Sequence, residues 1–158
     1  MSTERVPITP EGYKKLQEEL KRLKTVERPE IIKAIERARA FGDLSENAEY
    51  ETAKDRQGFI EARIKELEGK ISRAEIIDPS KLSSRDRVIF GVRVTLEEIE
   101  SGDKVTYQLV GPDESEPENG LISVTSPIGR ALLGKRVDDE VRVQVPGGIR
   151  EFVVLKIE

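Results

Sequence analysis

The stretch that decides the fold is residues 60–74, IEARIKELEGKISRA, in which apolar side chains recur every three or four positions. The apolar positions are Ile60, Ile64, Leu67, Ile71 and Ala74. This alternation of steps is a heptad repeat, which places all of these side chains on one stripe of an α-helix. Because such a stripe must be covered, we expect a second helix to pack against it.

The partner helix is predicted upstream, in residues 10–41. Its apolar side chains show similar spacing and are Leu16, Leu20, Leu23, Ile31, Ile35 and Ala38. The sequence Thr9-Pro10-Glu11 is typical of a helix start, with a cap, a proline and an acid in the first turn. Pro29 lies inside the arm, where its missing N–H predicts a kink or break. The sequence therefore predicts an antiparallel coiled-coil hairpin whose two arms are joined by residues 41–47.

The second half of the chain shows period-two alternation, which is typical of β-strands. Strands are predicted at residues 88–90, 92–94, 105–110, 121–124, 141–145 and 152–157. Residues 126–134 predict one short helix, capped by Ser126 and stopped by Gly134. The predicted fold class is α+β, with the hairpin at 1–77, a linker at 78–84 and a small, mostly antiparallel β-sheet domain with one short helix at 85–158.

Composition excludes several kinds of chemistry. The 158 residues contain no cysteine and no histidine, and the net charge is −4. A disulfide framework, a thiolate nucleophile, an imidazole base and a Cys- or His-type zinc site are therefore excluded. The negative charge argues against a general DNA-coating protein. The sequence has no apolar run of membrane-spanning length and no apolar signal-peptide core, so we expect a cytoplasmic protein without membrane contact.

Two carboxylates, Asp43 and Glu46, lie three residues apart where the predicted arms meet. The spacing alone favours a capping box over a metal site. As ligands the pair would be incomplete, because Mg²⁺ takes about six oxygens, so another macromolecule would have to supply the rest. Arg39 and Lys54 lie about one and two helical turns from these acids. They could contact phosphates, although a solvated, salt-bridged helix face explains them more simply.

Five segments together carry a family resemblance. They are TPEG (9–12), VERPEII (26–32), ARAFGDLSENAEY (38–50), LISVTSPIGRALLGK (121–135) and VPGG (145–148). In this order they resemble the GreA/GreB family of bacterial transcript cleavage factors, with the GreA side of the family as the closer match. The resemblance implies that the C-terminal domain has an FK506-binding-protein-like fold. It also implies an elongation factor that is not an enzyme by itself.

The resemblance further implies a mode of action on bacterial RNA polymerase. The C-terminal domain would dock on the rim of the secondary channel, at a coiled coil of the β′ subunit. The hairpin would then reach the active centre of a backtracked complex, where the polymerase cleaves the extruded 3′ end of the nascent RNA by two-metal hydrolysis. Asp43 and Glu46 would help hold the second, weakly bound Mg²⁺ that is shared with the polymerase, and Ser45 and Asn47 would support them.

Other site residues follow from the same resemblance. Arg39 and Lys54 correspond to a basic patch that contacts the extruded RNA. The residues assigned to polymerase docking are Ser126, Pro127, Ile128 and Gly129. A helix cap with proline in the first turn explains the same segment structurally, and both interpretations remain open. The protein is expected to be a monomer.

Three alternative functions have distinct sequence requirements. A Gre-like factor could occupy the channel and inhibit polymerase without stimulating cleavage, but residues 43–47 match the cleavage-competent type. A prolyl isomerase or chaperone-like module needs an aromatic-lined pocket, and the second half offers only Phe90, Tyr107 and Phe152. In a purely structural coiled-coil adaptor, the charged residues at the tip would be dispensable.

Overall fold

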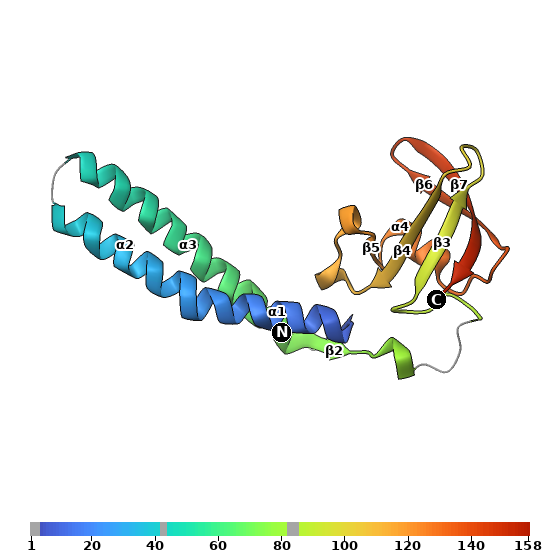
Figure 1. The fold of residues 1–158 in the computed structure, drawn as a ribbon, viewed down its shortest axis with the longest axis horizontal. Helices are drawn as coiled ribbons and strands as arrows, with labels where there is room; N and C mark the ends of the chain where they lie inside the picture. The colour runs from blue at the N-terminus through green and yellow to red at the C-terminus, as the bar shows by residue number, and fades with distance from the viewer. Residues whose placement is uncertain (1–3, 42–43, 82–85) are drawn as a thin grey trace. The chain divides into compact units, whose positions relative to one another are not determined.

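The computed structural model describes residues 4–41, 44–81 and 86–158, and for Phe41 and residues 44–47 it describes the backbone alone. Contacts divide the chain into two compact units, Lys14–Arg73 and Met1–Tyr13 with Ala74–Glu158. The predicted α+β class is confirmed, because an N-terminal helical hairpin precedes a small sheet that carries one short helix (Figure 1).

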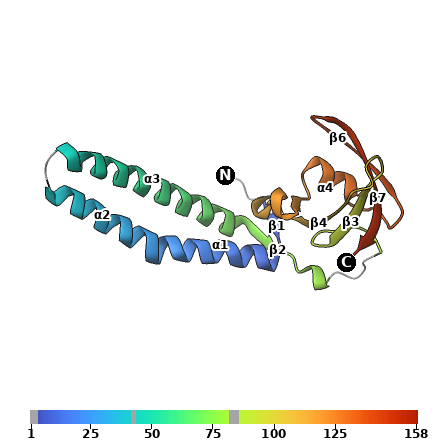
Figure 2. The same ribbon diagram turned by 45° about the horizontal axis from the view of Figure 1, so that its top comes forward.

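The hairpin has two arms that lie side by side (Figures 1 and 2). The first consists of α1 (Pro10–Arg22), a π-helical turn η1 (Leu23–Glu27) and α2 (Arg28–Phe41), and the second is α3 (Leu44–Arg73). Most of the predicted apolar seam is confirmed, with buried side chains at Leu16, Leu23, Ile31, Ile35, Ala38, Ile60, Ile64 and Leu67. Leu20 and Ile71 are only half-buried, and Ala53, which was not predicted, is buried as well. Although α3 has 30 residues, no helix in the described ranges is apolar enough over sufficient length to cross a membrane.

The predicted disturbance near Pro29 is a π-helical turn rather than a break. The N–H of Arg28 donates to the carbonyl of Leu23, five residues back. Pro29 has no N–H for the carbonyl four residues before it, which weakens the α-helical ladder at this point. Leu23 and Ile31 are one residue further apart than a heptad, and the wider turn absorbs this extra residue. The apolar stripe therefore continues through both segments of the arm.

The other unit contains two sheets. β1 (Val6–Ile8) pairs in parallel with β2 (Ala74–Ile76). The larger sheet has the order β5-β4-β3-β7-β6, and its strands are β3 (Arg93–Glu98), β4 (Lys104–Val110), β5 (Leu121–Ser123), β6 (Glu140–Val145) and β7 (Gly148–Ile157). Only the β4–β5 pair is parallel within this larger sheet. The sheet is thus mostly antiparallel, as predicted.

The core of this unit lies between the sheet and the short helix α4 (Pro127–Leu132). Alternate strand residues point into it, as period-two patterning requires. The fully buried side chains of the core include Val94, Leu96, Leu109, Leu132, Val141, Phe152 and Val154.

Two local predictions are wrong. Ala74 was assigned to the helical seam, but it begins β2, because its backbone pairs with Val6. Residues 88–90 were predicted as a strand, but Gly91 adopts a φ of +89° and turns the chain, so that β3 begins only at Arg93. Val88 is nevertheless buried. The alternation of apolar residues at 88–94 therefore reflects the burial of their side chains, and a turn can bury them as well as a strand can.

Glu114 fastens the start of α1 to the sheet-containing unit. Its carboxylate accepts hydrogen bonds from the N–H of Thr9 at 2.7 Å, the N–H of Gly111 at 2.9 Å and the hydroxyl of Thr9. Thr9 also caps α1 as predicted, because its Oγ1 accepts from the N–H of Gly12 at 3.1 Å. A Cβ at Gly12 would lie 2.1 Å from the Glu114 carboxylate. These contacts and the β1–β2 pairing explain why the structure groups residues 1–13 with the sheet, whereas the predicted hairpin domain ran from 1 to 77.

Candidate functional site

The predicted catalytic pair belongs to the junction of the two arms. α2 ends and α3 begins within residues 41–44, and Glu46 therefore lies in the first turn of α3. Asp43 is outside the described residues, as are the side chains of Ser45, Glu46 and Asn47. The roles assigned to these four residues stay predictions.

The donor chemistry of this junction fits a hard cation. Asp43 and Glu46 offer carboxylate oxygens, which suit Mg²⁺ and leave most of its coordination shell to other ligands. In the part of the chain that the structure describes, no three acidic side chains come together as a metal site. The side chains of the acids at the junction are outside that part, so their role as a partial ligand set stays a prediction.

The two predicted RNA-contacting cations are exposed on the arms. Arg39 lies in the last turn of α2, and Lys54 lies on α3, where its Nζ donates to Gln57 Oε1 at 3.3 Å. Neither forms an ion pair with another described side chain. Their role in binding RNA phosphates stays a prediction.

Further along the hairpin, the charges are paired in two rows. In one row an acid of the first arm meets a base of α3, and in the other row the order is reversed. The pairs are Glu19–Arg63 and Glu27–Arg56 in the first row and Lys24–Glu68 and Arg28–Glu61 in the second. Within each row, a residue later in the first arm pairs with a residue earlier in α3. The rows therefore favour the antiparallel register of the two arms.

These pairs also shift the titration of the glutamates. Hydrogen bonding from the Arg63 guanidinium lowers the pKa of Glu19 below its ordinary value, and burial only partly opposes this effect. Hydrogen bonding from Arg28 likewise lowers the pKa of Glu61. Both glutamates therefore titrate at lower pH in the folded hairpin than in an unfolded chain.

We expect the hairpin to lose stability as the pH falls below the ordinary pKa of a glutamate, because the pKa values of Glu19 and Glu61 are lowered in the folded hairpin. A carboxylate whose pKa is lowered by folding stabilises the fold above its unfolded pKa, and this stabilisation disappears as the pH falls through the folded pKa. Solvent screens these exposed pairs, so the contribution of each to stability is small. Melting followed by far-ultraviolet circular dichroism should show a weaker pH dependence for Glu19→Gln than for the wild type. Equal pH dependence in the two proteins would contradict this expectation, and Glu18→Gln is the matched control.

The predicted docking segment opens α4. Ser126 caps this helix, because its Oγ accepts from the N–H of Gly129 at 3.1 Å and donates to the carbonyl of Ser123 at 2.7 Å. A Cβ at Gly129 would lie 2.1 Å from that carbonyl oxygen, so glycine is required there. Pro127 is exposed, and Ile128 is half-buried against the core. The capping interpretation is confirmed, and the docking role remains a prediction.

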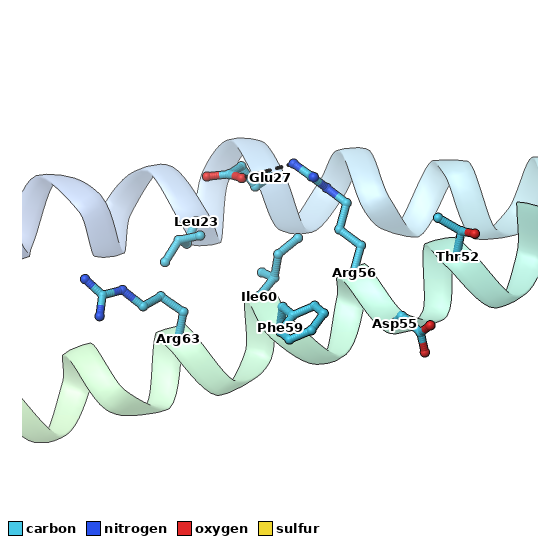
Figure 3. A pocket seen from close by; sticks show the side chains of 8 residues that line it. All are labelled: Leu23, Glu27, Thr52, Asp55, Arg56, Phe59, Ile60 and Arg63. Atoms are coloured by element: carbon cyan, nitrogen blue, oxygen red, sulfur yellow. Dashed lines mark ion pairs between the residues drawn. The ribbon is translucent and has the colours of Figure 1, made fainter.

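A groove that the sequence did not indicate lies along one side of the hairpin. It has a volume of about 460 Å³ and is lined by Leu23, Glu27, Thr52, Asp55, Arg56, Phe59, Ile60 and Arg63 (Figure 3). We call this set the Phe59 groove, because Phe59 is 77% exposed there. A second groove of about 400 Å³ shares Thr52 and Arg56 with it and reaches Ala48. The available signal was the position of Phe59, an aromatic residue directly beside the seam residue Ile60.

The fold and the junction define a two-part protein, an acid-tipped helical hairpin followed by a small sheet domain. Each part matches a known family model. Residues 6–76 match "Transcription elongation factor, N-terminal", and residues 83–158 match "Transcription elongation factor, GreA/GreB, C-term". The chain belongs to the GreA/GreB family of transcription elongation factors, which confirms the resemblance.

Individual relatives agree with this assignment. The chain is 56% identical over 152 residues to transcription elongation factor GreA of Verminephrobacter eiseniae and 55% identical over 152 residues to GreA of Syntrophotalea carbinolica, with 96% of each chain covered in both cases. Among solved structures, GreA factor homolog 1 (Gfh1) of Thermus thermophilus shares 34% identity, covers 98% of this chain and 99% of its own, and has a TM-score of 0.46. The alternative functions are not favoured, since both halves match elongation-factor models and the relatives matched over nearly the whole chain are named transcription elongation factor GreA.

Proposed function

We propose that this protein binds bacterial RNA polymerase in the cytoplasm, as a monomer, and stimulates cleavage of the RNA 3′ end in backtracked complexes. The observation that carries the proposal is the match of both halves to one elongation-factor family. Membership of that family implies an interaction with RNA polymerase.

In this proposal the two parts of the chain divide the work. Residues 126–129 and the start of α4 dock on the channel rim, at the β′ coiled coil. The hairpin enters the secondary channel. Its construction supports this role, because two helices that share a single apolar seam form a slender unit. The ion pairs along both sides of the seam hold the arms together without a thicker core.

The acids at the junction complete a metal site that the polymerase only partly supplies. Asp43 and Glu46 hold the second Mg²⁺ through their carboxylates, and Ser45 and Asn47 orient these carboxylates by hydrogen bonding. When bound, the ion supplies charge stabilisation and an activated water for phosphodiester hydrolysis. Arg39 and Lys54 bind phosphates of the extruded RNA and so hold the scissile bond near these acids. The chain alone is not expected to be a nuclease.

A backtracked-complex assay tests the proposal. Purified polymerase is halted in a backtracked state with 3′-labelled RNA and Mg²⁺, and the protein is then added. We expect rapid release of short labelled fragments, followed by renewed extension when nucleotides are supplied. The protein mixed with the same RNA without polymerase should release nothing. Failure to accelerate cleavage above polymerase alone would refute the function, and cleavage of free RNA would refute the shared site.

A further inference from the structure

We propose that the hairpin contains a flexible joint halfway along its length. The joint consists of η1 and Pro29 on the first arm and of Gly58 on α3. It separates a base segment, residues 14–22 and 59–73, from a distal segment, residues 30–57, and lets the distal segment bend relative to the base. The inference stands on the fold of the hairpin and is independent of the proposed function.

The first arm has three features that loosen a helix, and they follow one another along the chain. The hydroxyl of Thr25 donates to the carbonyl of Lys21 at 2.7 Å, a side-chain bond that competes with the helical ladder. The N–H of Arg28 donates to the carbonyl of Leu23 in the π-helical turn. Pro29 follows directly and has no N–H to donate. Helices bend at prolines, at π-helical turns and where a side chain enters the ladder, so this part of the first arm is where bending is easiest.

Gly58 weakens the second arm, and the fold gives no steric reason for a glycine at this position. A Cβ there would meet no neighbouring atom within 4 Å, whereas a Cβ at Gly129 would collide with a carbonyl oxygen. The backbone of Gly58 is helical, so no left-handed conformation requires glycine either. Glycine inside a helix is less stable than alanine, because its backbone keeps more freedom in other conformations. What glycine supplies at position 58 is therefore a local weakening of α3.

Ion pairs place Gly58 opposite the loosened part of the first arm. Arg56, two residues before Gly58, lies 3.6 Å from Glu27, the last residue of η1 (Figure 3). Glu61, three residues after Gly58, pairs with Arg28 at 2.8 Å. Gly58 thus lies across the seam from the end of η1. Two helices that pack side by side bend together only where both give way, and here the weak points of the two arms coincide.

The packing between the arms leaves room for bending at this point. The Phe59 groove, about 460 Å³ in volume, is lined by residues of both arms, with Leu23 on one side and Ile60 on the other. The ion pairs that bridge the arms here are exposed and individually weak, so they can adjust to a new angle. The seam is intact on both sides of the joint, since Ile31 and Ile64 are buried. The arms therefore stay paired while they bend.

A small bend at the joint moves the far end of the distal segment. Gly58 lies 14 residues after Leu44, the first residue of α3, which is roughly 21 Å along the helix axis at about 1.5 Å per residue. A change of direction of about 10° over this length displaces the first turn of α3 sideways by about 4 Å. Hinge motions of this kind take place in microseconds to milliseconds. The first turn of α3 can thus shift by several ångströms while the base segment stays in place.

Residual dipolar couplings of backbone N–H groups test the joint in the free protein. The couplings of a rigid hairpin fit one alignment tensor. A fixed bend changes only the relative orientation of the two segments, whereas motion between them makes their alignment tensors differ in magnitude. We expect the base and distal segments of the wild type to require tensors of different magnitude. Tensors of equal magnitude for the two segments would overturn the inference.

Gly58→Ala tests where the joint lies, and Gly69→Ala is the matched control. Both glycines are exposed on α3, and a Cβ at either position meets no neighbouring atom within 4 Å, so both variants should fold as the wild type does. Each alanine strengthens the helix to a similar extent. Gly69, however, lies four residues before the end of α3, where added stiffness leaves the angle between the two segments free. We expect Gly58→Ala to lose most of the difference in tensor magnitude and Gly69→Ala to keep it. An unchanged difference in Gly58→Ala would overturn the inference.

Discussion

Replacing both tip acids, Asp43→Asn together with Glu46→Gln, should abolish stimulated RNA cleavage while leaving polymerase binding nearly intact. Each amide has the shape of the acid it replaces but lacks the negative charge that a hard cation needs. We expect a loss of at least about 100-fold in the cleavage rate at saturating protein, equivalent to roughly 2.7 kcal/mol of transition-state stabilisation. The rate of RNA shortening in a backtracked complex measures this directly.

The same double variant separates metal binding from helix capping. An asparagine can cap α3 as well as an aspartate can, so the melting midpoint should change little. Glu51→Gln is the matched control, because Glu51 is an exposed acid further along α3. Cleavage by the double variant at the wild-type rate would show that the mechanism does not need these carboxylates. A large fall in its melting midpoint would instead assign the pair to the fold.

The largest effect on stability is expected from Phe152→Ala. Phe152 is 1% exposed in the core of the sheet, opposite Val141 in the β6–β7 register, and the Arg150 guanidinium lies 5.0 Å from its ring centroid. Emptying such a site costs about 3–5 kcal/mol, a large part of the roughly 5–15 kcal/mol that stabilises a typical domain. The free energy of unfolding should fall accordingly.

The measurement must report on the sheet alone, since the chain has two compact units that can unfold separately. Amide hydrogen exchange of β6 and β7 meets this need. Ile149→Ala is the matched control, because Ile149 lies on the same strand and is 56% exposed. We expect Ile149→Ala to change the free energy of unfolding by no more than about 0.5 kcal/mol. If the amides of β6 and β7 were equally protected from hydrogen exchange in Phe152→Ala and Ile149→Ala, the assignment of Phe152 to the core would be contradicted.

Features with a local period could be predicted from the sequence. The seam residues Ile60, Ile64 and Leu67 are buried as the heptad required, and the caps at Thr9 and Ser126 form as their sequences indicated. These features depend on neighbours within one or two helical turns, so a short window of sequence contains the information that determines them.

Features that depend on distant pairing could not be predicted. β1 and β2 have three residues each, which is too short to establish a period, and only their pairing with each other, from Val6–Ala74 to Ile8–Ile76, makes them strands. The acceptor role of Glu114 requires Thr9, a partner 105 positions away in the sequence, so no short window of sequence indicates it. Phe59 was visible in the sequence, but its exposure depends on how the two arms pack.

The bond between Thr9 and Glu114 spans 105 positions of the chain, and this has a consequence for biosynthesis. The ribosome releases β1 and the first turn of α1 early, but their partners β2 and Glu114 emerge much later. Until then the hairpin can close by itself, because both of its arms precede residue 74, whereas the amino-terminal segment must wait. A nascent chain interrupted between residues 76 and 114 would therefore present a finished hairpin whose leading end is held by the β1–β2 pairing alone and lacks the contacts of Glu114.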